Sequence, residues 1–198
     1  METIDGKATI LGALELKSVE GDVLRPASFQ ATIKAGAAVM DLTVQVVAIN
    51  SDIWVTNPIS ANQWEHVSGA EGADQAANVL TSLINPDRIF LLALKVLDDP
   101  QLDGTESIDG MNTTIVVGSF DPAKLKDLVS EGTATPPELG DLGISAGEPV
   151  DLTFWIADDG KVLRIEEAGP LTTTESRDVL RRFTFSKFNE PVEINPPA

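Results

Sequence analysis

Apolar and polar residues alternate along the first quarter of the chain. In the segment 27–34 the apolar residues Phe29, Ala31 and Ile33 are separated by polar ones, and the same alternation runs from Met40 to Ala48. A period of two is typical of a β-strand with one buried and one solvated face, and short connections between such strands indicate an antiparallel sheet. We therefore predict strands at about 7–17, 27–34, 38–48 and 52–56, with turns at 20–22, 34–36 and 49–52.

Helical spacing replaces this alternation after Gly72. A stripe containing Val79 and Leu83 predicts a helix over 73–84, and Asn85-Pro86 predicts the start of a second helix over 86–97. The second helix is apolar nearly all the way round, so one sheet face cannot cover it. This helix needs a second layer, a partner or an apolar ligand to bury its remaining surface. We expect it to form a movable cover over a cavity. A short third helix is predicted at 121–129.

The second half of the chain again reads as strands. A hairpin is predicted with strands at 101–107 and 112–120 around Asp109-Gly110, followed by a loop over 130–149. A closing meander turns at Asp159-Gly160, and Leu163 and Ile165 are expected to face inward after it. Inward-facing residues on its other two strands are Leu152, Phe154, Ile156, Phe183 and Phe185. The expected fold is a single α+β domain over 1–198, with a curved antiparallel sheet wrapped round a few helices.

Charge limits the classes of partner. The 198 residues include 31 acids and 14 bases, which gives a net charge of −17. Such a surface repels nucleic acid and anionic membranes. No run of roughly 18 apolar residues is present to span a bilayer. The chain has no cysteine and no signal-peptide core at its start, so a cytoplasmic protein and an exported protein trimmed of its signal are both open.

Candidate chemistry is sparse. His66 is the only histidine, no Gly-x-Ser-x-Gly elbow accompanies it, and nothing in the sequence gives it an orienting partner. Zinc would require several His or Cys ligands, and the pairs Asp98-Asp99 and Asp158-Asp159 lack calcium-loop spacing. We expect no catalytic residues, no metal and no cofactor. Trp54 and Trp64 are either core or hairpin-edge residues, or they rim the mouth of a cavity.

The C-terminal stretch 180–197 carries the pattern Phe-Ser-x-Phe-Asn-x-Pro-Val-x-Ile-x-x-Pro from Phe185 onward. It resembles the closing strand of the LppX/LprA/LprF/LprG lipoproteins of mycobacteria and relatives. Three further segments are similar to that family in the same order, so the resemblance covers about 50–195. These are Ile53-Trp54-Val55 followed by Trp64, the strand-turn-strand at 107–114, and Asp121-Pro122-Ala123-Lys124-Leu125.

This resemblance implies an exported lipoprotein with a LolA/LolB-like fold, in which a strongly curved half-barrel sheet cups helices. In that family a hydrophobic cavity between sheet and helices holds acyl chains of lipids or glycolipids. It further implies a location in the cell envelope, with envelope transport proteins as partners. Membrane association would come only from an N-terminal lipid anchor. The lipobox cysteine and export signal of the family are absent from this sequence.

One-sided strands and an all-apolar helix leave apolar surface that an acyl chain can cover, at about 0.8 kcal/mol per buried methylene. The expected function is a non-enzymatic carrier of lipid or glycolipid acyl chains in envelope lipid transport. The alternative is an envelope protein-interaction or signalling module with the same fold and a closed core. Strand parity and helix stripe select the residues expected to line the cavity: Ile33, Met40, Leu42, Val44, Val79, Leu83, Phe90, Phe154 and Phe183.

Overall fold

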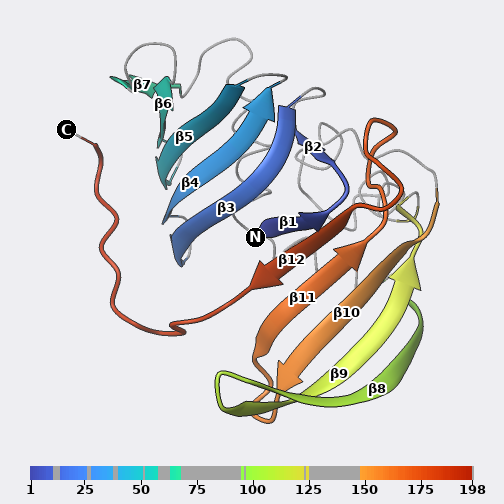
Figure 1. The fold of residues 1–198 in the computed structure, drawn as a ribbon. Coiled ribbons are helices and arrows are strands. Elements are labelled where there is room, and N and C mark those ends of the chain that lie inside the picture. The colour runs from blue at the N-terminus through green and yellow to red at the C-terminus, as the bar shows by residue number, and fades with distance from the viewer. Residues whose placement is uncertain are drawn as a thin grey trace.

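The described part of the protein contains twelve antiparallel strands (Figure 1). The computed structural model describes residues 1–10, 14–25, 28–37, 40–50, 52–57, 63–67, 95, 97–122, 124 and 148–197. The strands are β1 (Glu2–Asp5), β2 (Ala8–Ile10), β3 (Leu14–Leu24), β4 (Ser28–Ala37), β5 (Met40–Ile49), β6 (Asp52–Asn57), β7 (Gln63–His66), β8 (Asp98–Ile108), β9 (Met111–Phe120), β10 (Val150–Ala157), β11 (Val162–Ala168) and β12 (Leu180–Thr184).

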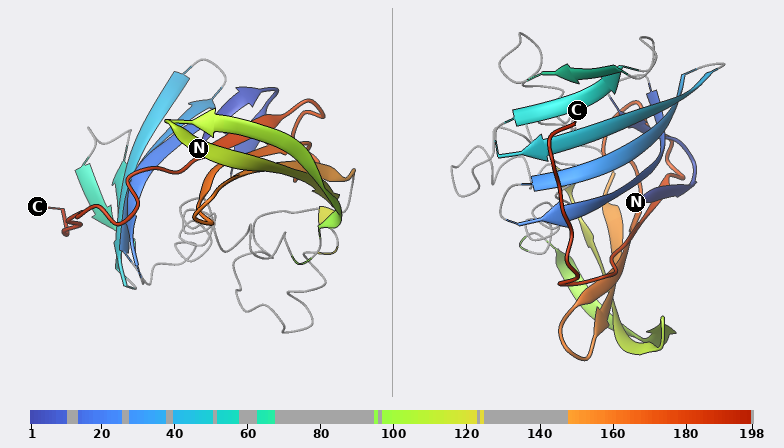
Figure 2. Two further views of the ribbon diagram at one scale, coloured as in Figure 1. Left: turned by 90° about the horizontal axis from the view of Figure 1, so that it is seen from below. Right: turned by 90° about the vertical axis from the view of Figure 1, so that its left-hand side faces the viewer.

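All twelve strands belong to one sheet, which bends strongly (Figure 2). The strand order is β7-β6-β5-β4-β3-β1-β12-β11-β10-β9-β8, with β2 paired to β3. The expected curved antiparallel sheet is therefore confirmed. The three expected helices fall almost entirely outside the described residues. Within the part of the chain that the structure describes, no helix has the length and apolar content needed to cross a bilayer.

The short strand β1 joins two half-sheets, β2–β7 and β8–β12 (Figure 1). It pairs with β12 at three positions, including Thr3 opposite Arg181, but with β3 only where Glu2 lies opposite Ser18. The backbone of Met1 adds two bonds to Val19, with N···O distances of 2.7 and 2.8 Å. Since β1 precedes the first expected strand, the seam of the sheet was missed in the sequence.

One face of the sheet carries most of the buried apolar residues. We call it the inner face and define it by Phe29, Ile33, Val46, Phe154 and Phe183; the opposite side is the outer face. Strand pairing shows that the alternation predicted for 27–34 and 38–48 is correct, because Phe29, Ala31 and Ile33 lie opposite Ala48, Val46 and Val44. The hairpin turn at Asp109-Gly110 is also confirmed, with φ of 50° and 79°.

Three sequence expectations about strands are wrong. The turns expected at 20–22 and 34–36 lie within β3 and β4. A register shift in β11 places Arg164 opposite Trp155 but Val162 opposite Ile156. Leu163 therefore packs with Trp155 on the outer face, whereas Ile165 faces inward as expected.

Candidate functional site

Six of the nine predicted site residues lie within the described part of the chain, and all six lie on the inner face. Val79, Leu83 and Phe90 lie outside it. Four of the six occupy the paired strands β4 and β5, and two lie in the other half-sheet. They are Ile33, Met40, Leu42 and Val44 on the first pair, with Phe154 on β10 and Phe183 on β12.

Exposure increases along the β4–β5 ladder. Ile33 is buried opposite Val44, which is half-buried, as is Leu42 opposite Ala35. Met40, at the start of β5, is 60% exposed. The same face therefore passes from packed core to apolar surface open to a ligand or another layer.

Phe154 and Phe183 belong to a second inner-face cluster. Phe154 is 2% exposed and pairs with Ile165, which in turn lies opposite Phe183. Met1 packs against this cluster and also against the β3–β5 cluster. The inner face is therefore apolar on both sides of the seam formed by β1.

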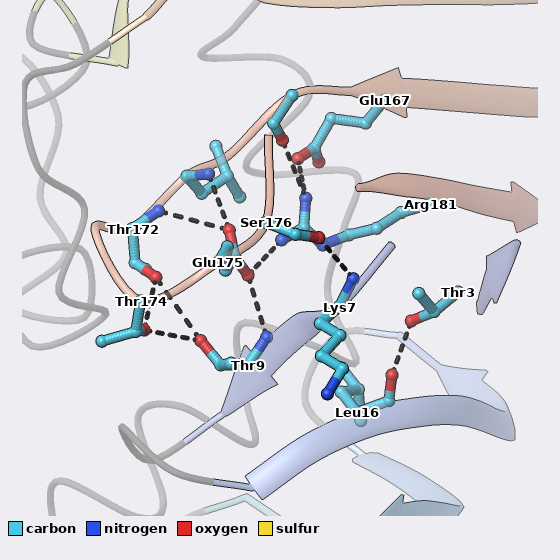
Figure 3. Close-up of polar contacts among 12 residues, drawn as sticks. Thr3, Lys7, Thr9, Leu16, Glu167, Thr172, Thr174, Glu175, Ser176 and Arg181 are labelled. Atoms are coloured by element: carbon cyan, nitrogen blue, oxygen red, sulfur yellow. Dashed lines mark hydrogen bonds and ion pairs between the residues drawn. The ribbon is translucent and has the colours of Figure 1, made fainter. Parts of the chain in front are cut away.

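A buried ion cluster joins β11, β12 and the segment between them (Figure 3). Arg181 on β12 donates from Nη1 to Oε1 of Glu167 at 2.6 Å and from Nη2 to Oε1 of Glu175. All three side chains are at most 7% exposed. The cluster holds two carboxylates and one guanidinium, so it is one positive charge short of neutral.

Glu175 also organises the segment between β11 and β12. Its carboxylate accepts bonds from the backbone N–H groups of Leu171, Thr172 and Thr9 at 2.7, 3.2 and 3.1 Å. The nearby hydroxyl of Ser176 accepts a bond from the Lys7 N–H at 2.6 Å (Figure 3). The segment 171–179 is thereby fastened across residues 7–9, next to the seam.

Strand parity could have located these charges from the sequence. Glu167 has the parity of inward-facing Ile165, and Arg181 has the parity of Phe183. Two opposite charges at inward positions of neighbouring strands indicate a buried pair, because an isolated buried charge is strongly unfavourable. The third member, Glu175, lies in a connection and carries no such signal.

Burial raises the pKa of the Glu167 carboxyl above its ordinary value of 4.5. The positive charge of Arg181 opposes this increase and the negative charge of Glu175 adds to it. Burial acts to lower the pKa of Arg181, but the two carboxylates outweigh it and raise that pKa. Arg181 therefore stays protonated, and the Glu167 carboxyl takes up a proton more readily as the pH falls than an exposed glutamate does.

The stability of the Glu167→Gln variant should increase relative to that of the wild type as the pH rises. A raised folded-state pKa contributes stability that is complete below the unfolded-state pKa and is lost as pH rises through the folded-state value. The Glu167→Gln variant has no carboxyl at this position, so it does not lose this stability as the pH rises. We expect the difference in free energy of unfolding, variant minus wild type, to increase between about pH 4 and pH 7 in urea titrations.

Glu166→Gln removes the same charge from the next residue, which faces the other way and bonds Arg182 at 2.7 Å, and it controls for net charge. A Glu167→Gln difference that falls with rising pH would contradict the assignment of Glu167.

His66 has a partner that the sequence did not reveal. It lies on β7 with Nε2 3.0 Å from Oδ1 of Asp52, and its ring centroid is 5.1 Å from that of Trp54. The expectation that His66 lacks an orienting group is therefore wrong. The pair is about half exposed. Among the described residues, no group of three His, Cys, Asp or Glu side chains is placed to hold a metal ion.

Solved structures with the same fold come from mycobacteria. LprF from Mycobacterium bovis matches with a TM-score of 0.59 and 22% identity, over 95% of this chain and 84% of that one. LppX from Mycobacterium tuberculosis matches with a TM-score of 0.58 and 22% identity, over 98% of this chain and 86% of that one.

Curated relatives agree with the structural comparison. The proteins named lipoarabinomannan carrier protein LprG in Mycobacterium tuberculosis and Mycobacterium bovis are 25% identical over 196 residues, which is 98% of this chain and 72% of theirs. The LppX_LprAFG lipoprotein family model matches residues 2–194. The chain therefore belongs to the LppX_LprAFG lipoprotein family.

Proposed function

We propose that this protein is a non-enzymatic carrier that holds acyl chains of a lipid or glycolipid against the inner face of its sheet. The observation that carries the proposal is the apolar inner face that extends on both sides of the seam. The name of the LprG relatives, lipoarabinomannan carrier protein, supports a glycolipid as cargo. Family membership supports a site of action in the cell envelope, with the protein anchored through an N-terminal lipid.

Exposed apolar side chains occur on the inner face of both half-sheets. Met40 is 60% exposed on β5, and Leu102 is 78% exposed on β8. Leu102 lies opposite Val116, which packs against the Phe154 cluster, so Leu102 points to the inner side. Burying ten methylenes of an acyl chain here would contribute on the order of 8 kcal/mol before ordering is subtracted.

The nine residues predicted from strand parity and helix stripe remain our proposal for the acyl contacts. Leu42 and Met40 are the most informative of the described ones, because they are apolar and incompletely buried. A tightly packed residue would unfold the protein when charged, whereas these two can report on binding.

Met40→Asp and Leu42→Asp should each weaken binding of a fluorescent fatty-acyl probe about tenfold or more, because the new carboxylate loses water when the chain binds. Met40→Asp should retain the wild-type melting temperature, since the site is exposed. Thr43→Asp adds the same charge to the exposed outer side of the same strand and should bind the probe like the wild type.

Organic extraction of the purified wild-type protein followed by mass spectrometry should release lipid. A folded wild type that carries no lipid and never binds the probe would rule out the carrier. That result would favour the protein-interaction module with a closed core.

A further inference from the structure

The outer face over β3–β7 is hollowed. The hollow has a volume of about 300 Å³, and β3, β4, β5 and β7 contribute its lining. Neighbouring strands are about 4.8 Å apart, so the row from β3 to β7 spans about 19 Å. A depression that crosses strands in this way suits an elongated ligand, and its volume lies at the lower end of that of ligand pockets, about 300–1,000 Å³.

Trp64 on β7 forms one end of the hollow. Trp64 lies opposite Thr56, and Trp54 lies opposite Val47, so both tryptophans point to the outer face, away from the inner-facing Ile53 and Val55. Only Trp64 lines the hollow. A half-buried indole has a flat apolar face and a polar N–H group. Its face can stack on another ring that has both apolar and polar atoms.

Neutral hydrogen-bonding groups occupy the middle of the hollow. Gln30 and Thr32 on β4 and Gln45 on β5 line it. Each side chain can both donate and accept hydrogen bonds. The amide Nε2 of Gln30 donates to Oδ2 of Asp22 at 2.9 Å, which holds both side chains in place before a ligand arrives.

Two carboxylates, Glu20 and Asp22 on β3, form the other end and are the charged groups among the described lining residues. They disfavour anionic ligands such as phosphates. They also lie at the opposite end of the strand row from Trp64, so one cationic head group cannot reach both the ring and the carboxylates. The ligand that uses every part of this surface is long and uncharged, with a flat apolar face at one end and hydroxyls along its length.

We propose that this outer-face hollow is a binding site for a short neutral carbohydrate chain, with Trp64 stacking on one sugar ring and Gln30, Thr32, Gln45 and Asp22 bonding hydroxyls. The site does not depend on acyl binding at the inner face, because it lies on the opposite side of the sheet. The C-terminal segment after β12 runs past the outer side of β3–β5 (Figures 1 and 2), while the described lining comes from the strands.

The test is calorimetric titration of the full chain with neutral trisaccharides that carry no acyl group, mannotriose and maltotriose, and with trilysine as a cationic probe. We expect saturable binding of at least one trisaccharide, unchanged by added salt. Trp64→Ala should weaken it about 3- to 10-fold, and Trp64→Phe should weaken it less. Glu20→Gln should leave trisaccharide affinity within about threefold, since no charge on the ligand is recognised.

Trp54→Ala is the matched control, because it removes the same ring from the same face outside the hollow. It should leave trisaccharide affinity unchanged, and melting temperatures should show that each variant is folded.

Absence of saturable trisaccharide binding to the wild type at millimolar concentration would overturn the proposal. Equal losses in Trp64→Ala and Trp54→Ala would also overturn it. Salt-sensitive binding of trilysine alone, lost in Glu20→Gln, would replace it with a site for a basic protein segment. Acyl-probe binding measured on the same samples keeps this result separate from the carrier function.

Discussion

Arg181→Leu is expected to lower the free energy of unfolding by about 3–5 kcal/mol at neutral pH. The substitution keeps an apolar stem but leaves Glu167 and Glu175 buried without their shared positive partner. The loss should shrink in acid, because a protonated carboxyl needs no cation beside it. Urea unfolding at neutral and acidic pH measures both effects.

Arg182→Leu provides the control, since Arg182 is the neighbouring residue and pairs with Glu166 on the more exposed outer face. The Arg182 and Glu166 side chains are 33% and 21% exposed, so water partly screens this pair and the variant should lose much less stability than Arg181→Leu. Adding Glu167→Gln and Glu175→Gln to Arg181→Leu should recover part of the loss. A loss of less than 1 kcal/mol in Arg181→Leu would show that the buried cluster does not stabilise the fold.

Phe154→Ala should also cost about 3–5 kcal/mol of unfolding free energy. Phe154 is 2% exposed and packs among Phe120, Val150, Leu152 and Ile165, so truncation leaves a cavity in the inner face. Chemical denaturation should show an unchanged denaturant slope and a lower midpoint.

Thr153→Ala, one residue away and pointing to the other face, should cost much less. If Phe154→Ala costs no more than Thr153→Ala, the packing of the Phe154 ring does not stabilise the fold.

Alternation predicted the strands whose two faces differ most. It succeeded for β4 and β5, where Ile33 and Val44 meet across the ladder, and for the hairpin at Asp109-Gly110. It failed where residues typical of turns lie inside a strand, as Glu20-Gly21-Asp22 does in β3. A Cβ on Gly21 would overlap the Gln30 carbonyl oxygen and lie 2.8 Å from the Ala31 Cα. The strands β3 and β4 therefore approach closely at Glu20-Gly21-Asp22, although the composition of this segment is typical of a turn.

Tertiary pairing explains the remaining differences. The four residues of β1 carry no local pattern that predicts a strand. They form one by pairing with Leu180 to Arg182, which lie at the other end of the chain. The bulge that turns Leu163 outward depends on how β10 and β11 align. For the site, parity placed six of the nine predicted residues on one face. It did not reveal the Asp52–His66 pair or the role of Glu175, since both depend on contacts between separate elements.

The pairing of β1 with β12 has a consequence for how the protein folds. Residues 2–5 meet residues 180–182, so the two half-sheets cannot join until nearly the whole chain is available. Contacts of such sequence separation slow folding. During synthesis from the N-terminus, the first half-sheet would expose the edge of β3 and its apolar face while the last strand is still missing. The nascent protein is then vulnerable to edge-to-edge aggregation, and a helper protein that covers this edge would increase its yield.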